Sequence, residues 1–137
     1  MRVRIVSLQL VTFALSTGIL LGQEARSSPK AKVVSLSNDS NDLPLLSGPP
    51  DSAGMHSGMV TLLKEQTVGK HNTKSYEEIL VVLQGEGEMI LEGQPPLAFH
   101  APAAVYCPPR TAHDVRNKGS APLRYVYVAA KASETSQ

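Results

Sequence analysis

Short runs of apolar and β-branched residues, separated by glycine and proline, make up the chain between residues 54 and 131. Their residue numbers are 59–63, 79–83, 89–91, 104–107 and 123–129. Helical periodicity does not persist in this region, whereas several short strands punctuated by glycine and proline are typical of a β-sandwich or β-barrel. The pattern therefore predicts an all-β domain over residues 54–131.

A glycine-rich segment, Gly85-Glu86-Gly87, separates the second and third of these runs. Glycine adopts the positive φ that tight turns need without steric cost. We expect a tight hairpin here, joining a strand at 79–83 to a strand at 89–91.

The first 22 residues differ in composition from the rest of the chain. They contain 13 apolar residues and two arginines, Arg2 and Arg4, but no acidic residue. A short basic segment followed by an apolar stretch is typical of a secretory signal peptide. We therefore expect residues 1–22 to be a signal peptide and the protein to be secreted or periplasmic. The alternatives are an uncleaved anchor, since residues 5–21 could just span a bilayer, and a buried helix.

Residues 23–53 are rich in serine, asparagine, aspartate and proline. Such a composition buries too little apolar surface to offset the loss of chain entropy on folding. We expect a flexible linker over residues 23–53, in which residues 33–36 could add a short edge strand. Residues 132–137 are expected to form a C-terminal tail.

Charge and cysteine content exclude several classes of protein. Residues 1–22 hold two of the 13 basic and none of the 12 acidic residues, so without them the net charge changes from +1 to −1. A near-neutral chain lacks the basic face with which nucleic-acid-binding proteins neutralise phosphates. The single cysteine, Cys107, allows neither an internal disulfide nor a cysteine-rich zinc site.

The predicted domain, residues 54–131, is small and has no disulfide. Domains of this size have marginal hydrophobic cores. We therefore expect a homodimer formed through a strand edge. A small molecule is the other expected partner, and no nucleic acid is expected.

Two adjacent carboxylates precede the most apolar run. Because side chains alternate along a strand, Glu78 shares a face with Val82, whereas Ile79 shares the other face with Leu83. Both faces are apolar, so we expect this strand to be covered on both sides, with Glu78 pointing into a pocket. A carboxylate there needs a partner, and a metal ion is one of the few that suffice. If the register slips by one residue, Glu77 points inward instead.

Histidines lie near this strand and near a later one. His71 comes shortly before the strand, and His113 follows the proline pair 108–109 and opens another short strand. Adjacent carboxylates on opposite faces exclude a glycosidase-type pair of acid and base. Beside Glu78, His113 is the second candidate ligand.

The spacing of the first group resembles the first motif of the cupin superfamily, G-x5-H-x-H-x(3,4)-E-x6-G. His71 stands at the first histidine, Glu78 at the glutamate and Gly85 at the closing glycine. Thr73 stands where the family has its second histidine, and the leading glycine is missing.

The second group resembles the second cupin motif, G-x5-P-x-G-x2-H-x3-N. Pro108, His113 and Asn117 stand at its proline, histidine and asparagine, whereas Arg110 replaces the inner glycine. Two motifs in the right order identify the chain as similar to small, single-domain, type-2-like cupins. The resemblance implies a small jelly-roll barrel with a metal in its mouth, preceded by the signal peptide and linker.

The family's usual ligands are three histidines and one glutamate, of which the resemblance leaves His71, Glu78 and His113. Two histidines and one carboxylate form a facial triad with open positions, as in non-haem iron oxygenases. The implied cofactor is one divalent metal ion: Fe, Mn, Ni or Zn. The implied activity is dioxygenase-like, or an isomerase-like or lyase-like step. The alternatives are a barrel that has lost its metal and a non-catalytic module that binds a small ligand or a sugar.

Four further residues could contribute to substrate binding or support the ligands. Thr73 could orient a water or serve only as a strand residue. Arg110 could bind a carboxylate or phosphate of a substrate, or be a solvated turn residue. Glu77 competes with Glu78, and His100 is a reserve ligand.

Other polar residues have structural interpretations. Cys107 is expected to be a buried apolar residue, and Asn117 to brace a turn through backbone hydrogen bonds. His56 fits neither motif and is interpreted as an ordinary loop or strand-end histidine. Tyr125 and Tyr127 share one face of the last strand, which favours packing at a sheet surface or dimer face.

Overall fold

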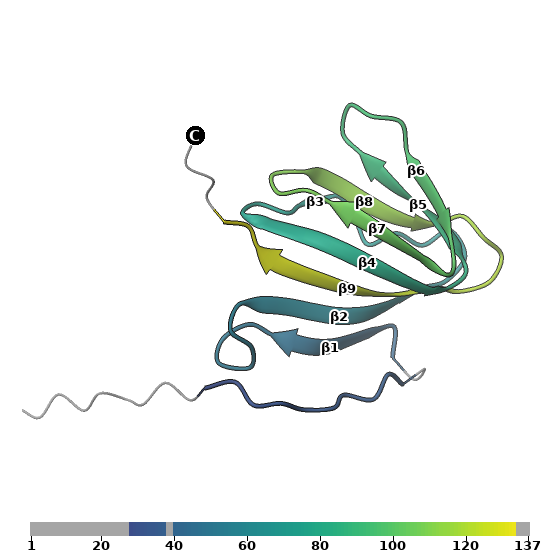
Figure 1. The fold of residues 1–137 in the computed structure, drawn as a ribbon. Helices are drawn as coiled ribbons and strands as arrows, with labels where there is room; N and C mark the ends of the chain where they lie inside the picture. Colours follow the sequence, from purple (N-terminus) through teal and green to yellow (C-terminus); the bar gives the residue numbers. More distant parts are fainter. Residues whose placement is uncertain (1–27, 38–39, 134–137) are drawn as a thin grey trace, which may run out of the picture.

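The computed structural model describes residues 28–37 and 40–133. In this part of the chain, nine strands form two antiparallel sheets (Figure 1). The strands are β1 (Asp42–Ser47), β2 (Met55–Leu62), β3 (His71–Asn72), β4 (Tyr76–Gln84), β5 (Glu86–Leu91), β6 (Leu97–His100), β7 (Ala103–Cys107), β8 (Ala112–Asn117) and β9 (Leu123–Lys131). The predicted all-β fold is confirmed. Within these residues there is no helix of the length and apolarity that crossing a membrane requires.

The two sheets enclose the core. One has the strand order β1-β2-β9-β4-β7 and the other β3-β8-β5-β6. Apolar side chains from both sheets meet between them, as alternation along half-buried strands predicts. Those at most 2% exposed are Leu80, Val82, Met89, Cys107, Val115 and Leu123.

The two faces of β4 differ in burial. Leu80 and Val82 point into the core and are 1% exposed, whereas Ile79, Val81 and Leu83 are 39–46% exposed on the outer face. The expectation that both faces would be covered is therefore wrong for the single chain. A continuous apolar run does not specify how many faces are covered, because covering depends on distant parts of the chain.

The chain crosses from one sheet to the other at Gly85. β4 pairs with β7 and β9, whereas β5 pairs with β6 and β8, so the expected hairpin between β4 and β5 is wrong. The expected positive φ is confirmed, since Gly85 has φ +84°. A Cβ atom here would lie 2.5 Å from the carbonyl oxygen of Pro122, so a side chain has no room at the crossing.

The structure differs from the expected linker over residues 23–53, because residues 42–47 form β1. This strand pairs with β2 from Asp42 opposite Val60 to Ser47 opposite His56. The segment is polar on average, but it contains a short apolar run at residues 43–46. The free edge of β2 supplies the backbone hydrogen bonds of this run. The optional edge strand at 33–36 does not form. The predicted signal peptide and residues 134–137 lie outside the described residues.

Asn117 braces the turn after β8, as expected. Its side-chain amide donates to the carbonyl oxygens of Leu62 and Ala121, both at 2.9 Å, and its oxygen accepts from the amide of Gly119 at 2.8 Å. The residue is almost fully buried, so these bonds satisfy a side chain that water does not reach. The end of β8 is thereby held to β2 and to the start of β9.

Candidate metal centre

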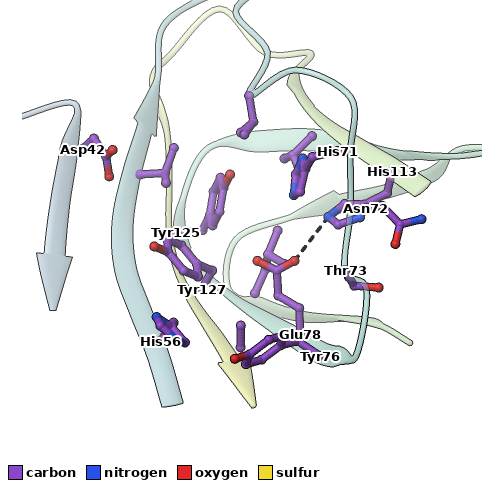
Figure 2. A pocket seen from close by; sticks show the side chains of 15 residues that line it. Asp42, His56, His71, Asn72, Thr73, Tyr76, Glu78, His113, Tyr125 and Tyr127 are labelled. Atoms are coloured by element: carbon purple, nitrogen blue, oxygen red, sulfur yellow. Dashed lines mark ion pairs between the residues drawn. The ribbon is translucent and has the colours of Figure 1, made fainter. Parts of the chain in front are cut away.

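Three predicted ligands lie together although they come from two sheets. His71 on β3 pairs directly with His113 on β8, and Glu78 reaches them from β4 in the opposite sheet. One potential ligand atom from each residue lies within 4.8 Å of the other two. Figure 2 shows the three side chains converging on the same side of a cavity. The arrangement is that of three donors around a common point.

His113 is oriented by contacts at both ring nitrogens. Its Nε2 lies 3.2 Å from Oε2 of Glu78, and its Nδ1 lies 3.4 Å from the carbonyl oxygen of Thr111. A carbonyl oxygen only accepts, so Nδ1 carries a proton and donates. Nε2 is thereby directed toward Glu78 and the common point, as a metal-binding histidine requires.

His71 is oriented in the same way, although it is exposed. Its Nδ1 lies 2.9 Å from the carbonyl oxygen of Gly69, to which it donates. The ring centroids of His71 and His113 are 4.2 Å apart, with 56° between the ring planes. Both histidines therefore use Nδ1 for a backbone carbonyl and keep Nε2 for another partner.

The protonation of His113 depends on opposing influences. Burial lowers its pKa, but the hydrogen bonds with Glu78 and with the Thr111 carbonyl outweigh burial, so the pKa lies above the ordinary value of a histidine. The protonated ring pairs with the Glu78 carboxylate. A divalent cation at the common point would replace that proton, since metal ligation needs a neutral imidazole.

The strand register distinguishes the two adjacent carboxylates. Glu78 lies opposite Cys107 on β7 and faces the cavity. Glu77 points to the outer face, where its carboxylate accepts a hydrogen bond from the Tyr106 hydroxyl at 2.9 Å. The alternative in which Glu77 replaces Glu78 is therefore wrong, because no slip in register occurs.

Thr73 stands at the family's second histidine position. Its hydroxyl both donates a hydrogen bond to the backbone and accepts one from it. It donates to the carbonyl oxygen of Pro108 at 2.9 Å and accepts from the amide of Thr111 at 3.0 Å. The residue lines the cavity and is nearly buried. Of the two interpretations of Thr73, the structure favours the structural one: its hydroxyl ties the chain before β4 to the turn before β8.

Two other predicted site residues lie away from the triad. Arg110 has φ +59°, is exposed, and borders a separate depression together with Glu92 and Gln94. His100 ends β6 and lies beside Pro102 and Tyr106. Neither lines the cavity next to the triad. The spacing of a motif does not show which way the side chain of a turn residue points. The structure therefore places neither Arg110 nor His100 at the cavity beside the triad.

Cys107 is buried, as expected, and touches a ligand. Its Sγ atom lies 3.5 Å from Nδ1 of His113. Burial, and then the nearby Glu78 carboxylate, raise the pKa of the Cys107 thiol to about 11. The thiol is therefore neutral at physiological pH and packs against the histidine without supplying a thiolate ligand.

A cavity of about 610 Å³ opens beside the triad. Its walls include Leu80 and Val115 from the core, so most of the surface is apolar. Small-molecule sites have this size and this mixture of apolar walls with a few polar groups. Tyr125 and Tyr127 both face into it, which confirms that they share one face of the last strand. That face lines the cavity and not an outer sheet surface.

His56 and Asp42 also line this cavity, and sequence reasoning missed both. His56 lies on β2, and its ring packs edge-on against Tyr76 with centroids 5.6 Å apart. Extending the alternation of β2 backward from Val60 would have placed His56 on the inner face. For Asp42 there was no alternation to extend, because its segment was expected to be a flexible linker and not a strand.

The residues present fit a divalent metal. Two imidazole nitrogens and one carboxylate oxygen are suitable donors for Fe, Mn, Ni or Zn, and the carbonyls of Gly69 and Thr111 orient the rings. Thr73 adds no fourth nitrogen. The triad therefore leaves coordination positions open toward the cavity.

The family model of the cupin domain matches residues 58–129, more than half of the 137-residue chain. This chain belongs to the cupin family. The matched segment contains the three converging residues and all strands from β3 to β8. No curated protein matches this cupin.

Solved structures agree with this fold. The cupin 2 conserved barrel domain protein of Salinispora arenicola shares 22% identity, with a TM-score of 0.62 over 75% of this cupin and 92% of that chain. The cupin domain of Schizosaccharomyces pombe Cnp3 shares 17% identity, with a TM-score of 0.59 over 66% of this cupin and 63% of that chain.

An enzyme has the same fold. The DMSP lyase DddQ of Ruegeria pomeroyi shares 21% identity, with a TM-score of 0.56 over 69% of this cupin and 48% of that chain. This cupin therefore spans less than two thirds of the Cnp3 domain and of the lyase. At these identities the likeness concerns the fold alone.

Proposed function

We propose that this cupin holds one divalent metal ion through His71, Glu78 and His113 and acts as a metal-dependent enzyme on a small organic molecule. The observation that carries the proposal is the convergence of three donor atoms within 4.8 Å at the wall of a cavity. Glu78 and His113 already form a close pair at 3.2 Å, and a cation between Glu78 and the two histidines would satisfy all three groups at once.

Each ligand has a defined task in this proposal. His113 and His71 present Nε2, because their Nδ1 atoms donate to backbone carbonyls. Glu78 supplies negative charge from the opposite sheet, which locks the two sheets around the ion. When bound, a divalent metal supplies a Lewis acid that polarises an oxygen of a bound molecule.

The open positions favour reactions in which a small molecule reaches the ion directly. A dioxygenase-like oxidation is the first candidate, since two histidines and one carboxylate with open positions suit oxygen and substrate together. An isomerase-like or lyase-like step is the second, supported by the fold shared with the DMSP lyase. The metal itself is Fe, Mn, Ni or Zn.

The experiment is elemental analysis of the protein purified from its own compartment. We expect close to one metal per chain, and His113→Ala and Glu78→Gln should lose it. Matched controls are His100→Ala and Glu77→Gln, which change the same residue types outside the cavity and should retain the metal. A wild-type protein without stoichiometric metal, or a His113→Ala variant with full metal, would contradict the proposal.

Oxygen consumption and product formation over a panel of small molecules then separate the candidate activities. Turnover with oxygen uptake supports an oxidation, and turnover without it supports isomerisation or elimination. Tight binding of a small ligand or sugar with no turnover would support the non-catalytic module instead. Each outcome is judged on protein whose metal content is known.

We also propose that the protein is exported, on the basis of the apolar segment with two arginines at residues 1–22. Expression of the full chain in a bacterial host, followed by mass determination of the product in each fraction, tests this. A mature protein that has lost about 22 residues and lies in the periplasm or medium is expected. An intact chain in the cytoplasm would contradict export.

A further inference from the structure

We propose that the cavity beside the metal selects a small organic molecule whose part distant from the metal is neutral or cationic, with Tyr125 donating a hydrogen bond to one of its oxygens and Asp42 rejecting a second anionic group. This inference rests on the proposed function, because it takes the metal end of the cavity as the reacting end. It names the substrate class that the rest of the cavity fits.

Apart from its histidines, the cavity wall carries charge of one sign. Among the residues that the structure describes, the wall contains two carboxylates, Asp42 and Glu78, and no lysine or arginine. Proteins bind carboxylates and phosphates with arginine or lysine, which supply directed N–H donors and positive charge. An anionic group can be balanced at the metal, whereas a second anionic group at the other end would meet the Asp42 carboxylate and no lysine or arginine of the described residues.

Asp42 lies at the end of the cavity distant from the triad. Figure 2 shows Asp42 and His56 on one side, the triad on the other, and the rings of Tyr125 and Tyr127 between them. Asp42 lies opposite Val60 in the register of β1 and β2. Its carboxylate forms no ion pair or side-chain hydrogen bond with any residue of 28–37 or 40–133. Its charge is therefore available to a ligand.

Tyr125 presents an unpartnered hydroxyl to the cavity. Its side chain is only 3% exposed, yet the hydroxyl has no hydrogen-bond partner in the described part of the chain. Burial above all, together with the Glu78 carboxylate, raises the pKa of Tyr125, so the group stays a neutral donor. The hydroxyl opens on the cavity and is therefore free to donate a hydrogen bond to an oxygen of a bound molecule.

Apolar walls fill the space between these polar groups. Leu80 and Val115 form the inner wall, and Val60 lies beside Asp42. A ligand that fits this distribution has a metal-binding oxygen at one end, an apolar body of roughly the size of one aromatic ring, and a neutral or amine-bearing tail. Two phenol rings, Tyr125 and Tyr127, offer flat surfaces for such a body.

Three catechols with the same metal-binding head and a two-carbon tail test the charge selection. They are dopamine with a cationic tail, 3,4-dihydroxyphenylethanol with a neutral tail and 3,4-dihydroxyphenylacetate with an anionic tail. Their dissociation constants are measured anaerobically by calorimetry with zinc-loaded protein. We expect the anionic probe to bind at least about tenfold more weakly than the other two, since its tail and the Asp42 carboxylate are like charges at the same end of the cavity.

Variants assign the effect to residues. Asp42→Asn should reduce the tenfold difference to less than about threefold, whereas Glu92→Gln, which removes a carboxylate outside the cavity, should leave it unchanged. Tyr125→Phe should weaken all three probes by roughly three- to tenfold, the effect of one lost hydrogen bond. Its zinc content and melting temperature should stay those of the wild type.

Zinc content measured on the same samples separates two kinds of failure. A wild-type protein that holds no zinc fails the proposed function, and this inference with it. A protein that holds zinc but binds the anionic probe as tightly as the others, or binds none of the three, fails the inference alone. Charge selection that survives Asp42→Asn overturns the assignment to Asp42.

Discussion

His113 and Glu78 belong to different sheets, yet Nε2 of His113 lies 3.2 Å from Oε2 of Glu78. The contact joins β8 to β4 at the wall of the cavity. A protonated histidine and a carboxylate form an ion pair at this distance, and a neutral histidine and a carboxylate can share a cation instead. In the proposed function, the same two atoms would hold the sheets together with either a proton or a metal ion between them.

The metal-free protein should lose stability as the pH rises above about 6.5. The pKa of His113 is raised in the folded state, so its contribution is fully present below the unfolded value of about 6.5 and is lost as the pH rises through the folded pKa. Urea unfolding of EDTA-treated protein between pH 5.5 and 8.5 measures this dependence. In Glu78→Gln the dependence should flatten, because the carboxylate partner is absent. A wild-type free energy of unfolding that rises over this range would contradict the assignment.

Thr73 should matter for stability through its hydroxyl. Thr73→Val removes the donor to the Pro108 carbonyl and the acceptor for the Thr111 amide, and both of these hydrogen bonds are partly buried. We expect a loss of on the order of 1–3 kcal/mol in the free energy of unfolding. Thr73→Ser keeps the hydroxyl and should cost clearly less. Equal losses in the two variants would show that the methyl group, not the hydroxyl, is what the fold needs.

Gly85→Ala and Gly93→Ala should show how much of the loss in stability comes from backbone strain and how much from a steric clash. Both glycines have positive φ, +84° and +72°, so alanine is strained at either position. At Gly93 nothing lies within 4 Å of an added Cβ, and we expect a loss of about 1–2 kcal/mol. At Gly85 the Cβ would also meet the Pro122 backbone at 2.5 Å, so the loss should be larger by several kcal/mol. Thermal unfolding of the two variants compares them, and equal melting temperatures would contradict the close approach.

Asn117→Ala should destabilise the turn between β8 and β9. The change leaves the Leu62 and Ala121 carbonyls without their donor and the Gly119 amide without its acceptor. We expect a loss of on the order of 2–4 kcal/mol by chemical denaturation, since several buried polar groups lose partners. Lys118→Ala, beside it but exposed and 3.8 Å from Glu88, should change stability by no more than about 1 kcal/mol. A mild effect at Asn117 would mean that water replaces its bonds.

The amino-acid sequence determined the features that depend on local spacing. Short apolar and β-branched runs predicted the strands, and the resemblance to the two cupin motifs implied that His71, Glu78 and His113 meet. Asn117 and the positive φ of Gly85 were also readable, because turn geometry is set by a few neighbouring residues. These predictions needed no knowledge of how distant strands pair.

The tertiary structure decided the features that depend on pairing between distant segments. It sent β4 and β5 to different sheets, left the outer face of β4 exposed, and excluded Arg110 and His100 from the cavity. Asp42, His56 and Tyr125 line one cavity only because β1, β2 and β9 lie side by side. No local pattern encodes that neighbourhood, since backbone hydrogen bonds between strands are the same for every sequence and only the packing of the whole core selects which strands meet.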